Sequence, residues 1–453
     1  MGNLLTSLLN STNALKTYTQ GLEVVQNDVT NSSTPGYVKQ IPTFEALPFD
    51  ISVGLPGGVS AGPVQNARDA FAEKNVRDHQ SALGFSQQQT SALNGVEANF
   101  SLSSKSGVAP AINALFQSFS SLSVNPSDPT ARQAVVDQAN HVAQAFHGAV
   151  TGLATSSQNV DGQTRSTISE INRLAGKIRQ LNAQRTVNAK GGVDAGIDAQ
   201  LNSTLEDLSQ YGDFTALQQP DGKVNLYLGG QTPVVLGNQS FAIQGDFSTP
   251  QTKILDSQGQ DITGQITAGQ LRGQLAVKNS LLPSYTTDLN TLAQTLADQV
   301  NSNLAQGVDA NGATPTTALF SYNATTGAAA TVGVTSLTPD QIAAASPSAP
   351  GGNGNALNLA ALGDANVVNG STFTQFYGAL AGRVGRDLSS AQDTQDTQQQ
   401  LLIQAQNLRK QTSGVSLDEE ATRLIEFQRA YQATSKLIGV LDSLTQTTID
   451  IIH

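Results

Sequence analysis

Apolar residues near the N-terminus recur with alternating spacings of four and three residues. The positions between them are mostly polar. A stripe with this period, sustained for about four heptads, predicts one amphipathic helix about 40 Å long. The positions of this N-terminal seam are Leu4, Leu8, Ser11, Leu15, Tyr18, Leu22, Val25 and Val29.

A second stripe with the same alternation occupies the end of the chain. Ser416 and Glu419 form a Ser-x-x-Glu capping box, which predicts where this second helix begins. Acidic residues at 418–420 place negative charge in the first turn, where the helix dipole favours it. The positions of this C-terminal seam are Leu424, Phe427, Tyr431, Thr434, Ile438, Leu441, Thr445, Thr448 and Ile452, and Leu437, Leu444 and Ile451 widen the stripe on one flank.

Neither terminal helix can bury its apolar stripe alone, and isolated helices are marginally stable in water. We therefore expect the two helices to pair with each other as a coiled coil and to contact other copies of the chain. The periodicity leaves one alternative open, in which both helices belong to an ordinary bundle that is closed within one monomer.

The first helix is expected to end at a turn with the sequence Thr34-Pro35-Gly36-Tyr37. The residues just before it, 31–33, are poor helix formers. Pro35 disfavours a helical conformation at Thr34, and a Pro-Gly pair suits the two central positions of a type II turn. An extended run is expected to begin after this turn, at Tyr37.

The middle of the chain changes its period twice. Residues 68–184 carry the spacing of helices with breaks, and residues 213–270 contain short β-branched runs separated by turn residues. A helical pattern returns at 275–304 and again at 373–412. Residues 307–371 are rich in Gly, Ala, Ser and Thr and indicate a loop with a few strands.

This nested order predicts a mainly α protein with a β insertion, elongated, with discontinuous domains and adjacent termini. A terminal coiled-coil domain would comprise residues 1–45 and 405–453, and a helical rod domain would comprise 46–212, 271–310 and 372–404. A small antiparallel β domain would comprise 213–270, and a Gly/Ala/Ser/Thr-rich loop or small β segment would comprise 311–371.

Composition narrows the classes of function. Of 453 residues only 13% are charged, and the net charge of −11 argues against a nucleic-acid partner. The chain has no cysteine, which removes disulfides, cysteine-based zinc sites and thiol catalysis. No stretch approaches the length of a membrane-spanning helix. The first basic residue is Lys16, so the positive start of a signal peptide is missing.

Candidate chemistry is sparse. Residues 58–62 match the Gly-x-Ser-x-Gly pattern of a nucleophile elbow, but Pro63 follows directly, where a helix should begin. His141 and His147 are six residues apart on an expected helix, so they point in different directions and cannot share a metal ion. We therefore expect no catalytic residue, no cofactor and no metal site.

The two ends also resemble a known group of proteins. The stretch Asn31 to Tyr37 and the segment 414–444 are similar to the terminal signatures of the axial proteins of the bacterial flagellum. The sequence LDEEA at 417–421 narrows this resemblance to the family of hook-associated protein 1 (FlgK). Three further segments are similar to that family: 125–139, 171–182 and 271–303.

The resemblance implies a structural protein that is exported through the flagellum's own secretion apparatus, without a cleaved signal peptide. Such proteins assemble outside the cell as a helical layer between hook and filament, through a coiled coil of their terminal helices. The implied partners are other copies of the chain, the hook protein, hook-associated protein 3 on the filament side, and an export chaperone at the C-terminal region. Neither nucleic acid nor membrane anchoring is implied.

Two other interpretations remain at this stage. The chain could be another axial component, such as a hook or rod protein, although LDEEA and the long helical middle favour the junction family. It could instead be an extracellular adhesin or hydrolase that uses helical ends, although no expected site supports that reading.

Overall fold

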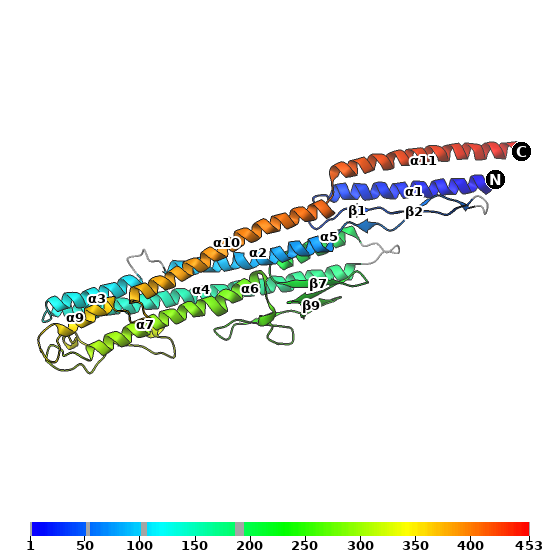
Figure 1. The fold of residues 1–453 in the computed structure, drawn as a ribbon. Helices are drawn as coiled ribbons and strands as arrows, with labels where there is room; N and C mark the ends of the chain where they lie inside the picture. Colours follow the sequence, from blue (N-terminus) through cyan, green and yellow to red (C-terminus); the bar gives the residue numbers. More distant parts are fainter. Residues whose placement is uncertain (1, 51–54, 101–106, 186–193, 453) are drawn as a thin grey trace.

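The computed structural model describes residues 2–50, 55–100, 107–185 and 194–452. The molecule is elongated, and both termini lie at the same end (Figure 1). Helices dominate, and the strands form small antiparallel sheets. The expected fold class, mainly α with a β insertion, is confirmed.

The terminal helices are α1 (Gly2–Asn31) and α11 (Leu417–Ile452), and they lie side by side. A long antiparallel hairpin follows α1 and contacts it. Its strands pair β1 with β6, β2 with β5, and β3 with β4. The six strands are β1 (Gln40–Ile41), β2 (Phe44–Ala46), β3 (Phe49–Asp50), β4 (Leu55–Pro56), β5 (Val59–Ala61) and β6 (Gln65–Asn66).

The rod is a bundle of long helices, and the apolar stripes of α2, α3, α7, α10 and the first part of α4 meet in one core. Asp128 caps the longest helix, α4, because its carboxylate accepts a hydrogen bond from the Thr130 amide and Pro129 occupies the first turn. Large side chains such as Tyr285, Phe119 and Phe146 are fully buried. The rod helices are α2 (Ala70–Glu97), α3 (Val108–Val124), α4 (Pro129–Gln184), α5 (Ala195–Ser209), α6 (Gly269–Ala276), α7 (Leu282–Leu304) and α10 (Phe373–Ser413).

A π-helical turn, Val277–Leu281, joins α6 to α7. It carries the buried Lys278, whose Nζ lies 2.7 Å from the Asp161 carboxylate of α4. The next residue, Asn279, donates a hydrogen bond to the Thr252 carbonyl and accepts one from the Thr252 amide. The π turn therefore connects the rod to the β insertion.

The β insertion contains a four-stranded antiparallel sheet in the order β10-β9-β8-β7, and a separate β11–β12 pair. The sheet packs on α4 and α5 in a second core, where Leu226 and Val235 meet Ile171 and Ile178. Asn182 of α4 accepts from the Val224 amide and donates to its carbonyl, as a neighbouring strand would. The strands are β7 (Phe214–Gln218), β8 (Val224–Leu228), β9 (Thr232–Leu236), β10 (Gln239–Ser240), β11 (Gln244–Asp246) and β12 (Lys253–Leu255).

Residues 307–371 pack onto the end of the rod that lies away from the termini (Figure 1). Ile342, Ala343 and Leu359 of this segment are fully buried in the rod core. The sequence pattern did not predict its helices, because they are short and lie among residues typical of loops. The segment contains β13 (Phe320–Ser321), α8 (Ala328–Thr331), β14 (Gly333–Val334) and α9 (Gly354–Ala361).

Candidate assembly surface of the terminal helices

Helix α1 has neighbours on two sides, because α11 covers one face and the hairpin covers another. Val25 is fully buried between them, whereas Val29 near the end of the helix is exposed. The remaining apolar and aromatic residues of the N-terminal seam are half-buried: Leu4, Leu8, Leu15, Tyr18 and Leu22.

On α11 the ring of Phe427 is the central contact. It lies over Gly21 of α1, where an added Cβ would stand 3.1 Å from the ring. The same ring makes an edge-to-face contact with Phe44 of the hairpin, at 5.6 Å between ring centroids. Leu424, Ile438 and Leu441 are half-buried, Tyr431 is exposed, and the side chain of Ile452 lies outside the described residues.

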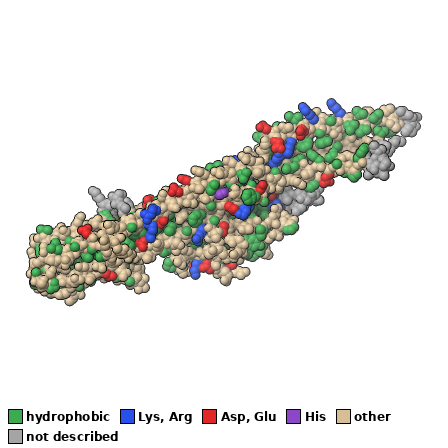
Figure 2. All heavy atoms as spheres, in the orientation of Figure 1, with side chains coloured by type: hydrophobic (Ala, Val, Ile, Leu, Met, Phe, Trp, Pro, Cys, Tyr) green, Lys and Arg blue, Asp and Glu red, His purple; other side chains and the backbone are tan. Residues whose placement is uncertain are grey.

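A second apolar stripe on α11 faces solvent. Leu437, Val440 and Leu444 keep 51%, 57% and 49% of their surface exposed. We call these three residues the outer stripe. On α1, Leu5 and Leu9 are exposed to a similar extent. Figure 2 shows hydrophobic side chains gathered over the terminal pair, so one copy of the chain leaves much of this surface uncovered.

The residues between α1 and the hairpin form the expected tight turn. The Tyr37 amide donates to the Thr34 carbonyl at 3.1 Å, which places Pro35 and Gly36 at the centre. Gly36 has a φ of +73°, the conformation that a type II turn needs at its third position. A Cβ at Gly36 would stand 2.2 Å from the carbonyl oxygen of Ala199, so the turn lies directly against α5.

Sequence reasoning missed the buried carboxylate of Asp28. Its Oδ1 accepts hydrogen bonds from the Tyr37 hydroxyl at 2.7 Å and from the Gln40 amide at 3.0 Å. Burial raises the pKa of Asp28, and these hydrogen bonds act in the opposite direction. Burial and the neighbouring carboxyl also raise the pKa of Tyr37. An acidic residue three positions after the seam residue Val25 was the signal that could have revealed it.

The start of α11 is tied to the same extended run. The Glu420 amide donates to the Ser416 carbonyl, so the helix begins where the sequence places its cap. The Glu419 carboxylate lies 2.6 Å from Lys39 and 3.0 Å from Arg423. The bond from Lys39 lowers the pKa of Glu419. Glu420 is fully buried, with Lys39 Nζ at 3.3 Å.

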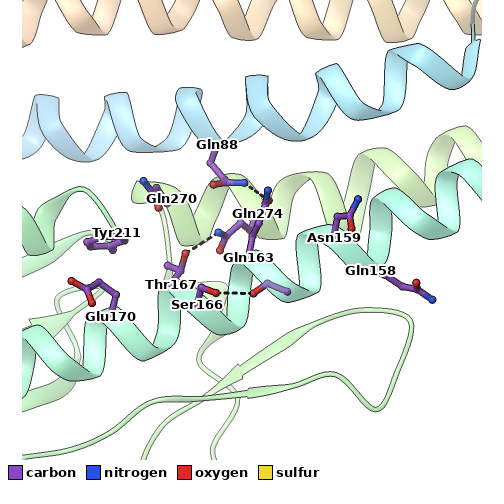
Figure 3. A pocket seen from close by; sticks show the side chains of 11 residues that line it. Gln88, Gln158, Asn159, Gln163, Ser166, Thr167, Glu170, Tyr211, Gln270 and Gln274 are labelled. Atoms are coloured by element: carbon purple, nitrogen blue, oxygen red, sulfur yellow. Dashed lines mark hydrogen bonds between the residues drawn. The ribbon is translucent and has the colours of Figure 1, made fainter.

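A cavity of about 790 Å³ lies on the rod between α2, α4 and α6 (Figure 3). Its lining is mainly amides and hydroxyls, such as Gln88, Gln163 and Thr167. The carboxylate of Glu170 at its edge pairs with Arg173 at 2.6 Å. Within the described ranges no group of three or more His, Asp or Glu residues could hold a metal ion. Because the lining is mainly uncharged and its carboxylate is paired with an arginine, the cavity is not arranged for acid–base catalysis.

The residues of the nucleophile-elbow pattern lie in the hairpin. Strand β5 contains Ser60 and leads to strand β6, so no helix follows it as an elbow requires. None of the helices in the described part of the chain is both long and apolar enough to cross a membrane.

Comparison with known proteins places the chain in a family. Residues 93–320 match the helical domain of flagellar hook-associated protein FlgK, and residues 409–451 match the C-terminal segment of the flagellar basal body rod FlgEFG proteins. Flagellar hook-associated protein 1 of Bacillus subtilis (strain 168) is 25% identical over 496 residues, covering 96% of both chains. The protein of that name from Salmonella typhimurium is 24% identical, and the match covers 69% of this chain and 58% of that protein.

One solved structure has a similar fold. The flagellar hook junction protein FlgK from Burkholderia pseudomallei aligns with a TM-score of 0.66 at 16% identity, over 74% of this chain and 99% of that one. The helical-domain match at residues 93–320 spans half of this chain. The chain therefore belongs to the FlgK family of flagellar hook-associated proteins.

Proposed function

We propose that this chain is a structural, non-catalytic protein that forms the junction layer between flagellar hook and filament. It assembles helically with copies of itself through its terminal helices. The observation that carries this proposal is the outer stripe on α11, which a single chain leaves half exposed. Membership of the hook-associated protein family, and the similar fold of the flagellar hook junction protein from Burkholderia pseudomallei, support a position at the hook–filament junction.

The outer stripe offers enough apolar surface to drive contacts between copies. Full burial of one large apolar side chain stabilises by about 1.5–3 kcal/mol. Leu437, Val440 and Leu444 each keep about half of that surface free. Repeated in every copy, such a contact stabilises a layer even though each single helix pair is weak.

Charge does not oppose this contact, although every copy carries a net charge of −11. Between Leu437 and Ile449 the only ionisable residue is Asp442, and none precedes Lys16 in α1. Like-charge repulsion between copies is therefore small at the terminal pair. Head-to-tail contacts of identical chains generate rings or helices, as a tubular layer requires.

The family membership makes the protein an exported component of the flagellum that associates with other flagellar proteins. The finer assignments are part of the proposal: an extracellular position at the junction and export without a cleaved signal peptide. Its partners would be the hook protein on one side and hook-associated protein 3 on the other. An export chaperone would bind the C-terminal region before assembly.

The domain bounds expected from the sequence are also part of the proposal. Residues 1–45 and 405–453 would form the terminal domain, and 46–212, 271–310 and 372–404 the rod. The β domain would comprise 213–270, and 311–371 would cap the far end. The β insertion shares its core with α4, α5 and α6, which attaches this domain to the rod.

Deletion of the gene tests the function. Electron microscopy of the cell surface and an assay of flagellin in the medium should show bare hooks and released flagellin. Intact filaments would contradict the proposal. Missing hooks would make the chain a rod or hook component.

A further inference from the structure

The terminal pair meets the rod at three segments of chain: the turn after α1, the residues between β6 and α2, and the link between α10 and α11. In the described structure α1 has extensive contacts with α11 and the hairpin, and no rod helix shares such contact with either terminal helix. We therefore expect the contacts at these links to set the angle between the terminal pair and the rod.

The rod meets the turn at a cluster of charged side chains. Arg68, just before α2, reaches Glu73 of α2 at 2.5 Å and Asp198 of α5 at 2.7 Å. The three side chains are almost completely buried. Arg185, at the end of α4, also binds Asp198, and Arg409 of α10 binds Glu73. The cluster thus joins four rod helices at the end where the terminal pair begins (Figure 1).

Arg68 is the member of this cluster that also holds the turn. Its Nη2 donates to the carbonyl oxygen of Gly36 at 2.7 Å, while Nε and Nη2 donate to Asp198. The planar guanidinium supplies donors in several fixed directions, which a lysine ammonium on a flexible stem does not. The turn is consequently fixed against α5, where a Cβ at Gly36 would overlap Ala199.

The other side of the turn is fixed to both terminal helices. Tyr37 donates to Asp28 of α1, and Lys39 pairs with Glu419 of α11. The Lys39 amide also donates to the carbonyl of Ser413, the last residue of α10. Residues 36–39 therefore form a short connector, with the rod on one side and both terminal helices on the other.

We propose that Arg68 is a positioning residue, which fixes the angle between the terminal pair and the rod by holding the Gly36 carbonyl against α5. This inference gives the proposed assembly role a further requirement: every copy must present its seam at the same angle. The role of Arg68 is a property of the single chain, so this proposal can hold or fail whatever the position of the layer in the flagellum.

The geometry separates this role from general stability. In the parent structure Glu73 also pairs with Arg409 at 3.1 Å, and Asp198 pairs with Arg185 at 2.8 Å, so both carboxylates still have a partner when Arg68 is replaced. The Gly36 carbonyl loses the donor described above. Arg68→Gln should therefore release the turn while the rod stays folded.

The test measures the angle directly in the full chain. Because the chain has no cysteine, Ser389→Cys on α10 and Gln428→Cys on α11 provide two unique sites for spin labels. Both positions are exposed, and Gln428 lies near the root of α11, where the connector acts. Pulsed electron paramagnetic resonance then gives the distribution of distances between rod and pair.

The parent chain should give one narrow distribution, and Arg68→Gln should broaden it severalfold. Arg68→Lys should give an intermediate width. Gly36→Ala leaves the ion cluster intact but forces the turn off α5, so it should also broaden the distribution. Lys74→Gln, which removes an exposed ion pair on the same helix α2, is the matched control and should change nothing.

Circular dichroism and the unfolding midpoint show whether the rod is intact in each variant. A broad distribution in the parent chain would overturn the proposal. Unchanged narrow distributions in both Arg68→Gln and Gly36→Ala would overturn it as well. A broadening that occurs only together with a lowered unfolding midpoint would assign Arg68 to rod stability instead. Gene deletion tests the proposed junction function, whereas the distance measurement tests the role of Arg68. A failure of one proposal can therefore be told apart from a failure of the other.

Discussion

The hydroxyl of Tyr37 lies 2.7 Å from Oδ1 of Asp28, and so the turn after the first helix folds back onto the helix that it ends. The Gln40 amide binds the same carboxylate. A buried acid thus organises the end of α1, the turn and the first strand of the hairpin. This arrangement makes the region sensitive to pH.

Burial raises the pKa of Asp28 in the folded chain above 3.8, the ordinary pKa of an aspartate side chain. The folded state therefore binds the proton more tightly than the unfolded state. This contribution to stability is fully present below pH 3.8 and is lost as pH rises through the folded pKa. In Asp28→Asn this loss should disappear, because the amide oxygen still accepts hydrogen bonds and carries no charge.

Hydrogen exchange of the Gln40 amide, measured from pH 4 upward and corrected for intrinsic rates, checks this prediction. Protection should fall with rising pH in the parent chain and stay level in Asp28→Asn. Parallel curves for the two proteins would contradict the assignment. Asp418→Asn, at an exposed position of α11, is the control.

Phe427→Ala should loosen the terminal pair, because the ring contacts both Gly21 and Phe44. Truncation of a fully buried Phe costs about 3–5 kcal/mol, and the half-buried Phe427 should cost about half of that. Trypsin should then cleave at Arg429 and Lys436 several times faster. Phe49→Ala on the same hairpin removes a mostly exposed ring and should leave the cleavage rate unchanged.

Leu437→Asp should block assembly without disturbing the monomer. The side chain faces solvent in one copy, so its charge would be desolvated only in a contact between copies. Secreted Leu437→Asp should have normal circular dichroism, and cells should lack filaments. Ser443→Asp adds the same charge at an exposed polar position and should allow filaments.

A comparison of Leu437→Asp with Ile438→Asp decides whether the terminal helices contact other copies or form a bundle that is closed within one monomer. Ile438→Asp places a charge beside α1 and should damage the pair within one chain as well as the layer. A closed monomeric bundle would tolerate Leu437→Asp and produce normal filaments, which would refute self-assembly through the outer stripe.

Asn182→Leu should destabilise the β insertion. The buried amide donates to the carbonyls of Val224 and Gly237 and accepts from the Val224 amide. Each buried group left without a partner costs about 1–3 kcal/mol. The urea midpoint of the insertion should fall, whereas Asn159→Leu, at an exposed position of the same helix, should leave it in place. Equal midpoints in the two variants would contradict the strand-like role of Asn182.

The sequence predicted those parts of the structure that depend on neighbouring residues. The heptad spacing predicted α1 and α11, and Pro35-Gly36 predicted the turn, because period and turn chemistry are local. The contact of Arg68 with Asp198 joins residues 130 positions apart, and no local pattern predicts it. The sequence pattern places Leu437 on the flank of the apolar stripe, but only the packing of α11 against α1 shows that this side chain faces solvent.

Helix α4 runs for 56 residues, about 84 Å, without a break. Near its start Arg132 donates to the carbonyl oxygens of Asp340 and Ile342, in the segment 307–371 that covers the end of the rod away from the termini (the far cap). Near its end Asn182 holds the β insertion, and Arg185 joins the ion cluster. A force applied at the far cap therefore reaches the root of the terminal pair along one continuous ladder of backbone hydrogen bonds. Helix α4 would therefore transmit a tensile force from the outer surface of the layer to the terminal helices, without any loop being stretched.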